Sequence, residues 1–317
     1  MTTLVTTPFS AQTTAADVLA GVDLTGQRII VTGGAAGIGI ETAAALAAAG
    51  AEVTLAVRNL QAGQQAAAQI AETTGSKQVF AAPVDLADQG SVAEFVAAWD
   101  MPLDVLVNNA GLMAAPEMRT PQGWEMQFAT NHFGHFALAT GLHDALAAAA
   151  RHAPGQSRVV SVSSSAHLGS GIGFDDIHFR QRPYEPWSAY AQSKTANVLF
   201  AVEATKRWAA DGIAVNALMP GAIRTGLQRY VSDDELDRMR KASGGAAPNW
   251  KTPQQGAATS VLLAASPLVE GVSGKYFEDC NEAGPNQPGT RRGVAAHALD
   301  PEAAARLWHV SEQTVAS

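Results

Sequence analysis

The sequence contains very little cysteine: Cys280 is the only one among 317 residues. A single thiol excludes a disulfide within the chain and favours a reducing compartment, and we interpret Cys280 as a space-filling side chain rather than a nucleophile. No run of about 18 apolar residues occurs, so no transmembrane helix is expected. The N-terminal residues also lack the basic start and apolar run of a secretory signal. These absences predict a soluble, cytoplasmic protein without a membrane partner.

Charged and aromatic side chains are scarce as well. Charged residues make up 16% of the chain and aromatic residues 6%, and the net charge is -8 with no basic cluster. An acidic chain without a basic patch argues against a nucleic-acid partner. Hydrophobic residues make up 47%, which indicates a globular protein with a substantial core. We predict no metal site.

Short β-rich runs alternate with longer alanine-rich runs from residue 27 onward. We expect strands at 28–32, 52–57, 78–84, 103–111, 158–164, 213–221 and 274–277, and helices at 40–50, 59–75, 89–99, 121–150 and 188–211. The strands are apolar on both faces, as buried parallel strands are. The alternation therefore predicts an α/β fold, a doubly wound parallel (Rossmann) sheet of about seven strands with helices on both faces and right-handed crossovers.

The domain organisation follows from the same alternation. No second alternation, internal repeat or Pro/Ser-rich linker is present, so residues 27–280 are expected to form one domain. Residues 1–26 are interpreted as an N-terminal arm. Residues 281–317 are expected to form a C-terminal loop and a helix that packs on the same domain. Asp300 and Pro301 suit the N-cap and first turn of that helix.

A glycine-rich turn, "VTGGAAGIG", follows the first strand and opens the first helix. Gly33, Gly37 and Gly39 allow a tight turn and the close approach of a diphosphate, and the free N–H groups of the helix face the phosphates. The alternative is a plain flexible turn. Asp85 ends the third strand, where it can accept a hydrogen bond from an adenine amino group or cap the next helix.

Tyr190 and Lys194 lie four positions apart in "SAYAQSKTANVLF", a run of helix formers. Residues at this spacing share one face of a helix, so the phenol and the ammonium are expected side by side. A lysine stem that packs on a tyrosine ring is also an ordinary surface contact. Taken alone, the pair is compatible with a chemical role and with a structural one.

Several motifs together resemble the short-chain dehydrogenase/reductase family, over about residues 25 to 280. They occur in the family's order: "TGGAAGIG" at 32–39, "DL" at 85–86, "NNAG" at 108–111, "NHFG" at 131–134, "VSSS" at 162–165, "YAQSK" at 190–194 and "PGAIRT" at 220–225. The glycine spacing is similar to that of the family's compact single-domain branch. The segment between Ser164 and Tyr190 is long, and its "FDD…AYAQSKTANVLF" pattern resembles the retinol dehydrogenase and WW-domain oxidoreductase members.

The resemblance implies a catalytic set of Asn131, Ser164, Tyr190 and Lys194. Tyr190 is the implied general acid/base, and a nearby Lys194 cation would lower the pKa of its phenol. Ser164 would hydrogen-bond the substrate carbonyl, with Ser163 and Ser165 as register alternatives. Asn131 would hold a water that relays protons to Lys194; the alternative is a polar residue inside a helix, bonded to a neighbouring backbone group.

The resemblance also implies a nicotinamide cofactor. Asn108 would brace the sheet, and Thr225 would meet the nicotinamide carboxamide. The implied cofactor-binding residues are Gly33, Ala35, Gly37, Ile38, Gly39, Arg58, Asp85, Leu86, Asn109, Ala110, Gly111, Tyr190, Lys194, Pro220, Gly221, Ile223 and Thr225.

The end of the second strand indicates which cofactor is preferred. Relatives that prefer NAD carry an acidic residue there, which binds both ribose hydroxyls and repels a 2′-phosphate. That position here is Val57, and the next residue, Arg58, can donate to a phosphate. We therefore expect NADP(H) to be preferred, with NAD(H) as the alternative and with stacking on adenine as the other role for Arg58.

The predicted function is hydride transfer between the nicotinamide and a ketone or aldehyde and the corresponding alcohol. The aromatic segment at 168–187 either suits a bulky apolar carbonyl substrate or only packs the loop down. A cofactor-binding regulator without turnover and a reductase of C=C or C=N bonds are the alternative functions. The expected partner is a small carbonyl or alcohol molecule, and the helices at 121–150 and 188–211 offer a surface for a homo-oligomer.

Overall fold

A central eight-stranded sheet organises the chain. The computed structural model describes residues 3–152, 157–232, 234–235, 238 and 250–316. The strands run in the order β3-β2-β1-β4-β5-β6-β9-β10, all parallel except β10. Their bounds are β1 Arg28–Thr32, β2 Glu52–Val57, β3 Val79–Pro83, β4 Val105–Asn108, β5 Ser157–Val162, β6 Ile213–Met219, β9 Tyr276–Glu278 and β10 Asn281–Glu282. This confirms the predicted doubly wound α/β class.

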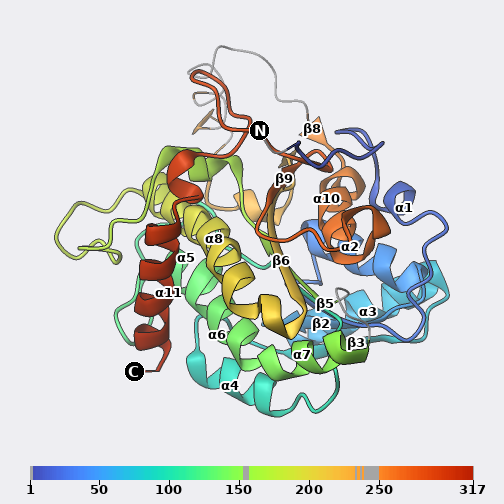
Figure 1. Cartoon of the computed structure of the whole chain (residues 1–317). Helices are drawn as coiled ribbons and strands as arrows, with labels where there is room; N and C mark the ends of the chain where they lie inside the picture. The colour runs from blue at the N-terminus through green and yellow to red at the C-terminus, as the bar shows by residue number, and fades with distance from the viewer. Residues whose placement is uncertain (1–2, 153–156, 233, 236–237, 239–249, 317) are drawn as a thin grey trace.

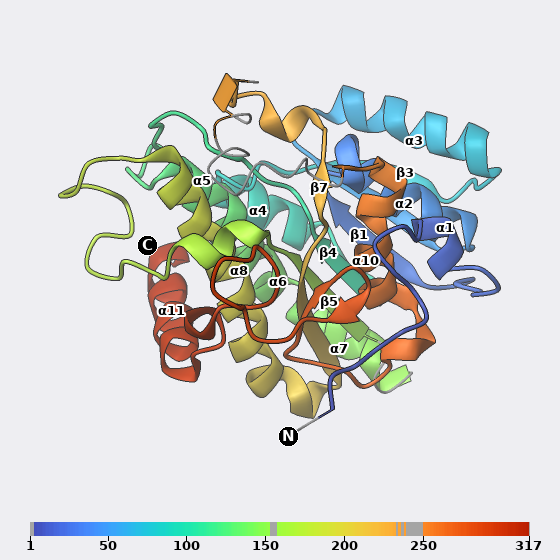
Figure 2. The ribbon, with the colours of Figure 1, turned by 90° about the horizontal axis from the view of Figure 1, so that it is seen from above.

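Helices cover both faces of the sheet, as Figure 1 and Figure 2 show. α1, α2, α3 and α10 lie on one face, and α4, α6 and α8 lie on the other, with α11 outside α8. The bounds are α1 Ala15–Val18, α2 Gly37–Ala48, α3 Leu60–Thr74, α4 Gln89–Ala97, α5 Met126–Phe128, α6 Gly134–Gly141, α7 His143–His152, α8 Pro186–Trp208, α10 Pro253–Ala265 and α11 Pro301–Val315. A separate small sheet pairs β7 (Ala222–Ile223) with β8 (Trp250–Lys251).

The N-terminal residues belong to the core on the first face. Ala15, Val18 and Leu24 are buried among residues of α2 and α10. The preceding segment runs beside β10, where Val5 N–H donates to Glu282 Oε2 and Glu282 N–H donates to the Val5 carbonyl. Residues 3–26 therefore contribute buried apolar surface and cover one end of the sheet.

The helix expected at 121–150 is not continuous, and that prediction is wrong. Gly123 has a φ of +83°, which is incompatible with a right-handed helix, so no helix begins at residue 121. Glu125 caps α5 instead, by accepting the N–H groups of Gln127 and Phe128. A π-helical turn, Ala129–Phe133, follows, then α6, and a break at Leu142 separates α7. π turns often mark functional sites, because they turn a side chain out of the regular helical register.

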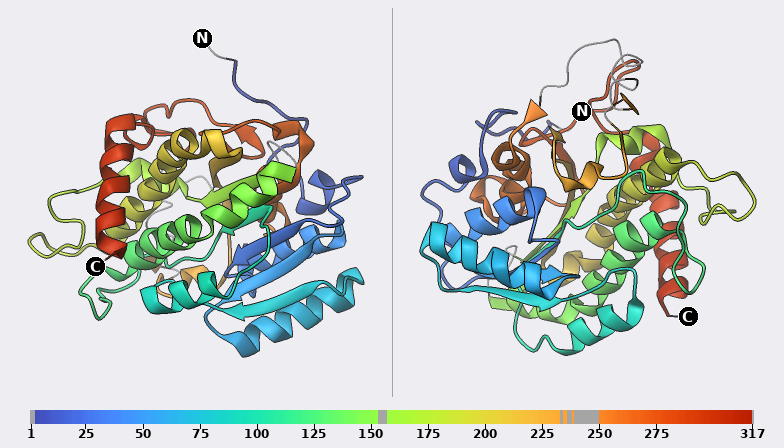
Figure 3. Two further views of the ribbon diagram at one scale, coloured as in Figure 1. Left: turned by 60° about the horizontal axis from the view of Figure 1, so that its bottom comes forward. Right: turned by 180° about the vertical axis from the view of Figure 1, so that it is seen from behind.

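The C-terminal helix α11 lies along α8, and Figure 3 shows this from two sides. Asp300 caps α11 and Pro301 is its first residue, as the sequence predicted. Trp308 packs edge-on to Phe136 at 4.9 Å between ring centroids, stacks on Phe200 at 5.9 Å and contacts Trp208 at 5.6 Å. The chain's own α11 thus covers part of the α8 surface that the sequence offered for a homo-oligomer.

Replacing Trp308 by alanine is expected to destabilise the protein by about 3–5 kcal/mol, because the indole is 4% exposed and its loss leaves a cavity among three aromatic rings. Chemical unfolding followed by fluorescence measures the change. Leu268→Ala is the matched control, because Leu268 is 51% exposed and its truncation should cost less than about 0.5 kcal/mol. Equal effects of the two substitutions would contradict the structural role given to α11.

Candidate active site

A cavity of about 1420 Å³ opens at the carboxyl ends of the strands. It lies beside the switch between β1 and β4, where the direction of strand order reverses and ligands bind in sheets of this type. Every residue that the sequence named as cofactor-binding lines this cavity, and so do Ser164, Tyr190 and Lys194. Asn131 is the one predicted site residue that does not line it.

The glycine-rich turn lets a ligand approach its backbone closely. Gly37 has a φ of +58°, and a Cβ on Gly39 would lie 2.4 Å from the Gly33 carbonyl oxygen, so a larger residue cannot occupy position 39. α2 begins at Gly37, and its N-cap, Ala36, has no side-chain oxygen to accept the first N–H groups. These donors stay available to an anion, as a diphosphate site at a helix N-terminus requires.

The two asparagines at the end of β4 have different surroundings from those expected. Asn109 Nδ2 donates to the Thr32 carbonyl at 2.7 Å, and its main-chain N–H donates to Thr32 Oγ1 at 2.8 Å. Asn108 is buried, and within the described part of the chain its amide has no hydrogen-bond partner. The expectation that Asn108 braces the sheet is therefore wrong: the bracing contact to β1 is made by Asn109.

Asp85 and Arg58 line the cavity beyond the carboxyl ends of β3 and β2. Asp85 Oδ1 accepts the Ala87 N–H at 2.9 Å, while the N-cap of α4 is Asp88, so Asp85 does not cap that helix. Val57 is buried at the end of β2, and the Arg58 side chain after it is exposed. Among the described residues that line the cavity, Asp85 is the only carboxylate.

The three serines after β5 have distinct environments. Ser163 Oγ is buried and donates to the Lys194 carbonyl at 2.7 Å, so it holds β5 against α8. Ser165 Oγ accepts a hydrogen bond from Arg291 at 3.1 Å. Ser164 Oγ caps the following turn by accepting the Ala166 N–H, and the Ser164 hydroxyl lies close enough to Tyr190 to lower the pKa of its phenol. Ser164 is therefore the serine beside the phenol.

Tyr190 and Lys194 lie in the first turns of α8, which starts at Pro186 after the N-cap Glu185. Lys194 Nζ is 5.7 Å from the centre of the Tyr190 ring and donates to the Val162 carbonyl at 2.9 Å. The two side chains are 3% and 4% exposed. The expected side-by-side arrangement is present, and it is buried rather than on the surface.

The acidity of the pair differs from the expectation. Burial raises the pKa of Tyr190 to about 12, although the Ser164 hydrogen bond and the charge of Arg291 lower it. Burial also lowers the pKa of Lys194 to about 8. The lowered phenol pKa inferred from the sequence is therefore wrong for the protein chain alone, because removal from water outweighs the neighbouring charges.

Asn131 lies in the π turn with its side chain fully engaged. Its Nδ2 donates to the Leu112 carbonyl and to Ser193 Oγ, both at 2.9 Å, and its Oδ1 accepts the Leu112 N–H at 2.8 Å. These contacts match the alternative of a polar helix residue bonded to nearby backbone. The side chain ties the loop after β4 to α8, and a water relay through Asn131 stays a prediction.

His135 and His167 do not line the cavity but contact the predicted site residues Asn131 and Ser164, and they were not predicted from the sequence. His135 Nδ1–H donates to the Asn131 carbonyl at 3.0 Å, so its Nε2 accepts from the Thr32 hydroxyl at 2.9 Å. His167 accepts the Ala295 N–H on Nε2 at 3.1 Å, and its Nδ1–H donates to the Ser164 carbonyl at 2.7 Å. Both rings are buried, and burial lowers both pKa values to about 4. The sequence signals are weak: His135 stands in the largely apolar run "HFGHFALA", and His167 stands two positions after the "VSSS" motif.

An apolar wall lies next to Tyr190. Met113, Trp187 and Leu227 pack around its ring, and the Trp187 and Tyr190 ring centroids are 6.1 Å apart. Met118, Met126 and Tyr230 line the same cavity. We call these six residues the apolar wall; flexible methionines and flat aromatic rings accommodate large apolar molecules.

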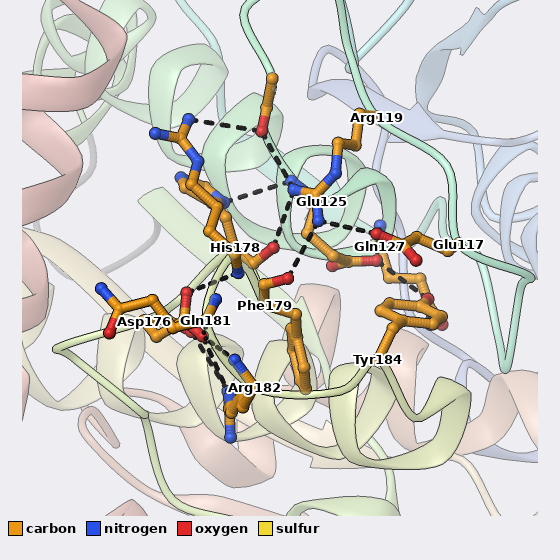
Figure 4. Close-up of polar contacts among 12 residues, drawn as sticks. Glu117, Arg119, Glu125, Gln127, Asp176, His178, Phe179, Gln181, Arg182 and Tyr184 are labelled. Atoms are coloured by element: carbon orange, nitrogen blue, oxygen red, sulfur yellow. Dashed lines mark hydrogen bonds and ion pairs between the residues drawn. The ribbon is translucent and has the colours of Figure 1, made fainter.

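The aromatic segment at 168–187 contributes only Trp187 to the cavity. The rest is held down by polar contacts to residues 117–127, which Figure 4 shows. Arg119 donates to the carbonyls of His178 and Phe179 at 2.8 and 3.0 Å, and Tyr184 donates to the Ala115 carbonyl at 2.9 Å. Apart from Trp187, the aromatic rings therefore pack the loop down, which was the alternative interpretation.

The fold and the site together define the class of protein. A doubly wound sheet with a glycine-rich turn at its switch point and a buried Ser–Tyr–Lys group defines a dinucleotide-dependent oxidoreductase. A family model described as short chain dehydrogenase matches residues 27–236. The chain belongs to the short-chain dehydrogenase/reductase family, and it is an oxidoreductase that binds a nicotinamide cofactor.

Three similar proteins illustrate this membership. The chain is 56% identical over 306 residues to a Streptomyces lividans protein named "Probable oxidoreductase", a match that covers 93% of this chain and 100% of that protein. It is 38% identical over 297 residues to human retinol dehydrogenase 13, covering 92% and 85%. The solved RhlG/NADP active-site complex of Pseudomonas aeruginosa has a TM-score of 0.63 at 26% identity, covering 80% and 95%.

The described residues show neither a membrane-spanning helix nor a cluster of metal ligands. No helix among them is long and apolar enough to cross a membrane. Within the same residues, no group of three or more His, Cys, Asp or Glu side chains can hold a metal ion. Cys280 is buried in the core beside Thr259, and burial raises the pKa of its thiol, as suits a space-filling side chain.

Proposed function

We propose that this protein is a cytoplasmic, NADPH-dependent carbonyl reductase for bulky, apolar ketones or aldehydes. The observation that carries the proposal is the contact between the Ser164 and Tyr190 hydroxyls beside the apolar wall, in the cavity that also holds the glycine-rich turn. A carbonyl oxygen that binds between the two hydroxyls accepts two hydrogen bonds. Its carbon then faces the part of the cavity where a nicotinamide fits.

Proton transfer is assigned to Tyr190. Because burial raises its pKa to about 12, the phenol is protonated at neutral pH, which is the form that carbonyl reduction needs. Ser164 orients the carbonyl and stabilises the developing alkoxide. Lys194 supplies positive charge to the phenolate that remains. The bound cofactor supplies the hydride, and the residues of the glycine-rich turn and of the β2 and β3 ends hold it.

A panel of carbonyl compounds tests this proposal. Aryl ketones and aldehydes of increasing size, and one bulky enone, are offered with NADPH or NADH, and the products are identified. We expect alcohols as products, with the larger aryl ketones preferred. A saturated ketone formed from the enone would identify a C=C reductase instead, and tight cofactor binding without any turnover would favour the regulator.

NADPH should exceed NADH by at least about tenfold in kcat/KM, because a charge-assisted hydrogen bond from Arg58 to the 2′-phosphate is worth roughly 1.5–3 kcal/mol. Arg58 lines the cavity, and Val57 leaves the end of β2 without a carboxylate to repel a phosphate. The NADP-bound structural relative supports the same choice. Steady-state kinetics with both cofactors at one ionic strength measure the ratio.

A double variant, Val57→Asp with Arg58→Ala, should reverse this order. Arg306→Ala is the control, because Arg306 is an exposed arginine paired with Asp175 outside the cavity, and it should leave the ratio unchanged. Equal use of NADPH and NADH by the unmodified protein would show that Arg58 does not select the cofactor.

A further inference from the structure

The loop before α11 brings a cation to the cavity. Gly289, Thr290 and Arg291 line it together with Tyr190. Arg291 Nη2 donates to Ser165 Oγ at 3.1 Å, next to the serine that contacts the phenol. The charge of Arg291 also lowers the pKa of Tyr190. A guanidinium from the C-terminal part of the chain therefore lies close to the proposed proton donor.

Hydrogen bonds across its base give this loop a defined shape. Asn286 N–H donates to the Val294 carbonyl and Val294 N–H donates to the Gly284 carbonyl, both at 2.9 Å. Asn286 Nδ2 also donates to the Thr290 carbonyl at 3.2 Å and to the Arg292 carbonyl at 2.5 Å. Arg291 is thus presented by an ordered turn, not by a free tail.

The neighbouring arginines of the loop have opposite surroundings. Arg292 pairs with Asp279 and with Glu278, the latter at 3.5 Å. Arg291 has no carboxylate partner within the described part of the chain, and its only hydrogen bond there is to a neutral hydroxyl. The charge of Arg292 is therefore balanced by carboxylates of the protein, whereas the charge of Arg291 is available to a ligand.

The charged side chains among the described residues that line the cavity are mostly positive, although the whole chain carries a net charge of -8. Asp85, the one carboxylate among these described lining residues, lies with Arg58 at the ends of β3 and β2. Near the apolar wall the lining charges among them are Lys194, Arg229 and Arg291, and Arg229 lies over the wall residue Tyr230 at 4.8 Å from the ring centre. Glu235 accepts a hydrogen bond from Trp187 Nε1 at 2.6 Å and is not among the lining residues.

We propose that Arg291 is a carboxylate-binding residue of the substrate site, so that the natural substrate is a bulky apolar ketone or aldehyde with a terminal carboxylate. This rests on the proposed function, because it names the class of substrate reduced there. The planar guanidinium matches a carboxylate with two parallel hydrogen bonds. Ser165 and the ordered loop hold the side chain in advance, which reduces the entropy lost on binding.

Paired substrates test the proposal. Aryl ketones that differ only in the chain between the carbonyl and a terminal carboxylate are each compared with their methyl esters, with NADPH. For at least one chain length we expect the acid to exceed its ester by at least about tenfold in kcat/KM, through KM. Arg291→Met should bring this ratio close to one. The preference should also weaken as ionic strength rises, because the site is open to solvent.

Arg292→Met is the matched control, since it removes a cation from the same loop outside the cavity, and it should keep the acid/ester ratio. An equal loss of both substrates in Arg291→Met, the same loss in Arg292→Met, or a weakened NADPH affinity in place of a changed ratio would overturn the assignment. If no ketone is reduced, the proposed function fails instead. In that case calorimetry measures the binding of the same acids to two NADPH complexes, that of the unmodified protein and that of Arg291→Met. Weaker binding to Arg291→Met would support the carboxylate site, and equal binding would overturn it.

Discussion

Replacing Tyr190 by phenylalanine should lower kcat for ketone reduction by about 10²–10⁴-fold, the usual contribution of a general acid. The substitution removes the transferable proton and the hydroxyl group beside Ser164 but keeps the ring that packs against Met113, Trp187 and Leu227. The affinity for NADPH should therefore change by less than about fivefold, because the loss of one neutral hydrogen bond is worth about 1 kcal/mol or less. Single-turnover kinetics and fluorescence titration of the cofactor separate the two effects.

Tyr184→Phe is the matched control for this substitution. This substitution also removes a phenol hydroxyl, but the Tyr184 hydroxyl contacts Ala115 and Gln127, which do not line the cavity. Turnover should therefore stay close to that of the unmodified protein. If Tyr190→Phe keeps more than about a tenth of kcat, another group donates the proton, and the role given to Tyr190 has to be abandoned.

Acid should destabilise the protein steeply between about pH 6.5 and pH 4. Burial lowers the pKa of His132 to about 3 and those of His135, His167 and His178 to about 4. In this window the unfolded chain binds protons on these imidazoles and the folded chain does not, so the free energy of unfolding falls as pH falls. The stability from these groups is complete above about pH 6.5, the ordinary histidine pKa.

The size of this effect follows from proton counting. Each proton taken up only by the unfolded chain lowers the free energy of unfolding by about 1.4 kcal/mol per pH unit, so four histidines give about 5.6 kcal/mol per pH unit. Glu125 acts in the opposite direction, because burial raises its pKa and the folded chain then binds a proton first. A net slope of about 4 kcal/mol per pH unit is expected, measured from urea unfolding at several pH values.

Single substitutions identify the histidines responsible. His132 is 2% exposed and hydrogen-bonds Ser311 through Nε2 at 2.8 Å. His132→Gln should remove about one third of the slope, whatever it does to stability at neutral pH. His309→Gln, at an exposed position of the same chain, should leave the slope unchanged. A free energy of unfolding that is flat from about pH 6.5 to pH 4.5 would contradict the prediction.

Local patterns were sufficient for seven of the eight strands of the sheet and for the residues that line the cavity, whereas the short antiparallel strand β10 was not predicted. β1 and β2 have the predicted bounds, and Gly33, Gly37 and Gly39 form the expected turn, because each feature depends on residues adjacent in sequence. Strand ends of a parallel sheet meet at one edge, so ordering the motifs along the chain was enough to collect their residues in one cavity.

Sequence patterns could not assign a role where the same residue type fits more than one environment in the fold. The three serines after β5 are chemically alike, and only the packing of α8 on β5 turns Ser163 inward and leaves Ser164 beside Tyr190. The aromatic segment at 168–187 likewise suited a substrate pocket or a packed loop. Its contacts with Arg119 and other residues of the 117–127 segment, distant in the chain, decided for packing.

Sequence patterns were enough to predict the class of fold, the family and the residues that line the cavity, because these follow from hydrophobic periodicity and from compact motifs. The π turn at Asn131, the burial that raises the Tyr190 pKa and the approach of Arg291 to the cavity became visible only in the folded chain. Each of these depends on which segments exclude water from one another or meet across the fold. That information lies in the packing of the whole chain and in no single stretch of it.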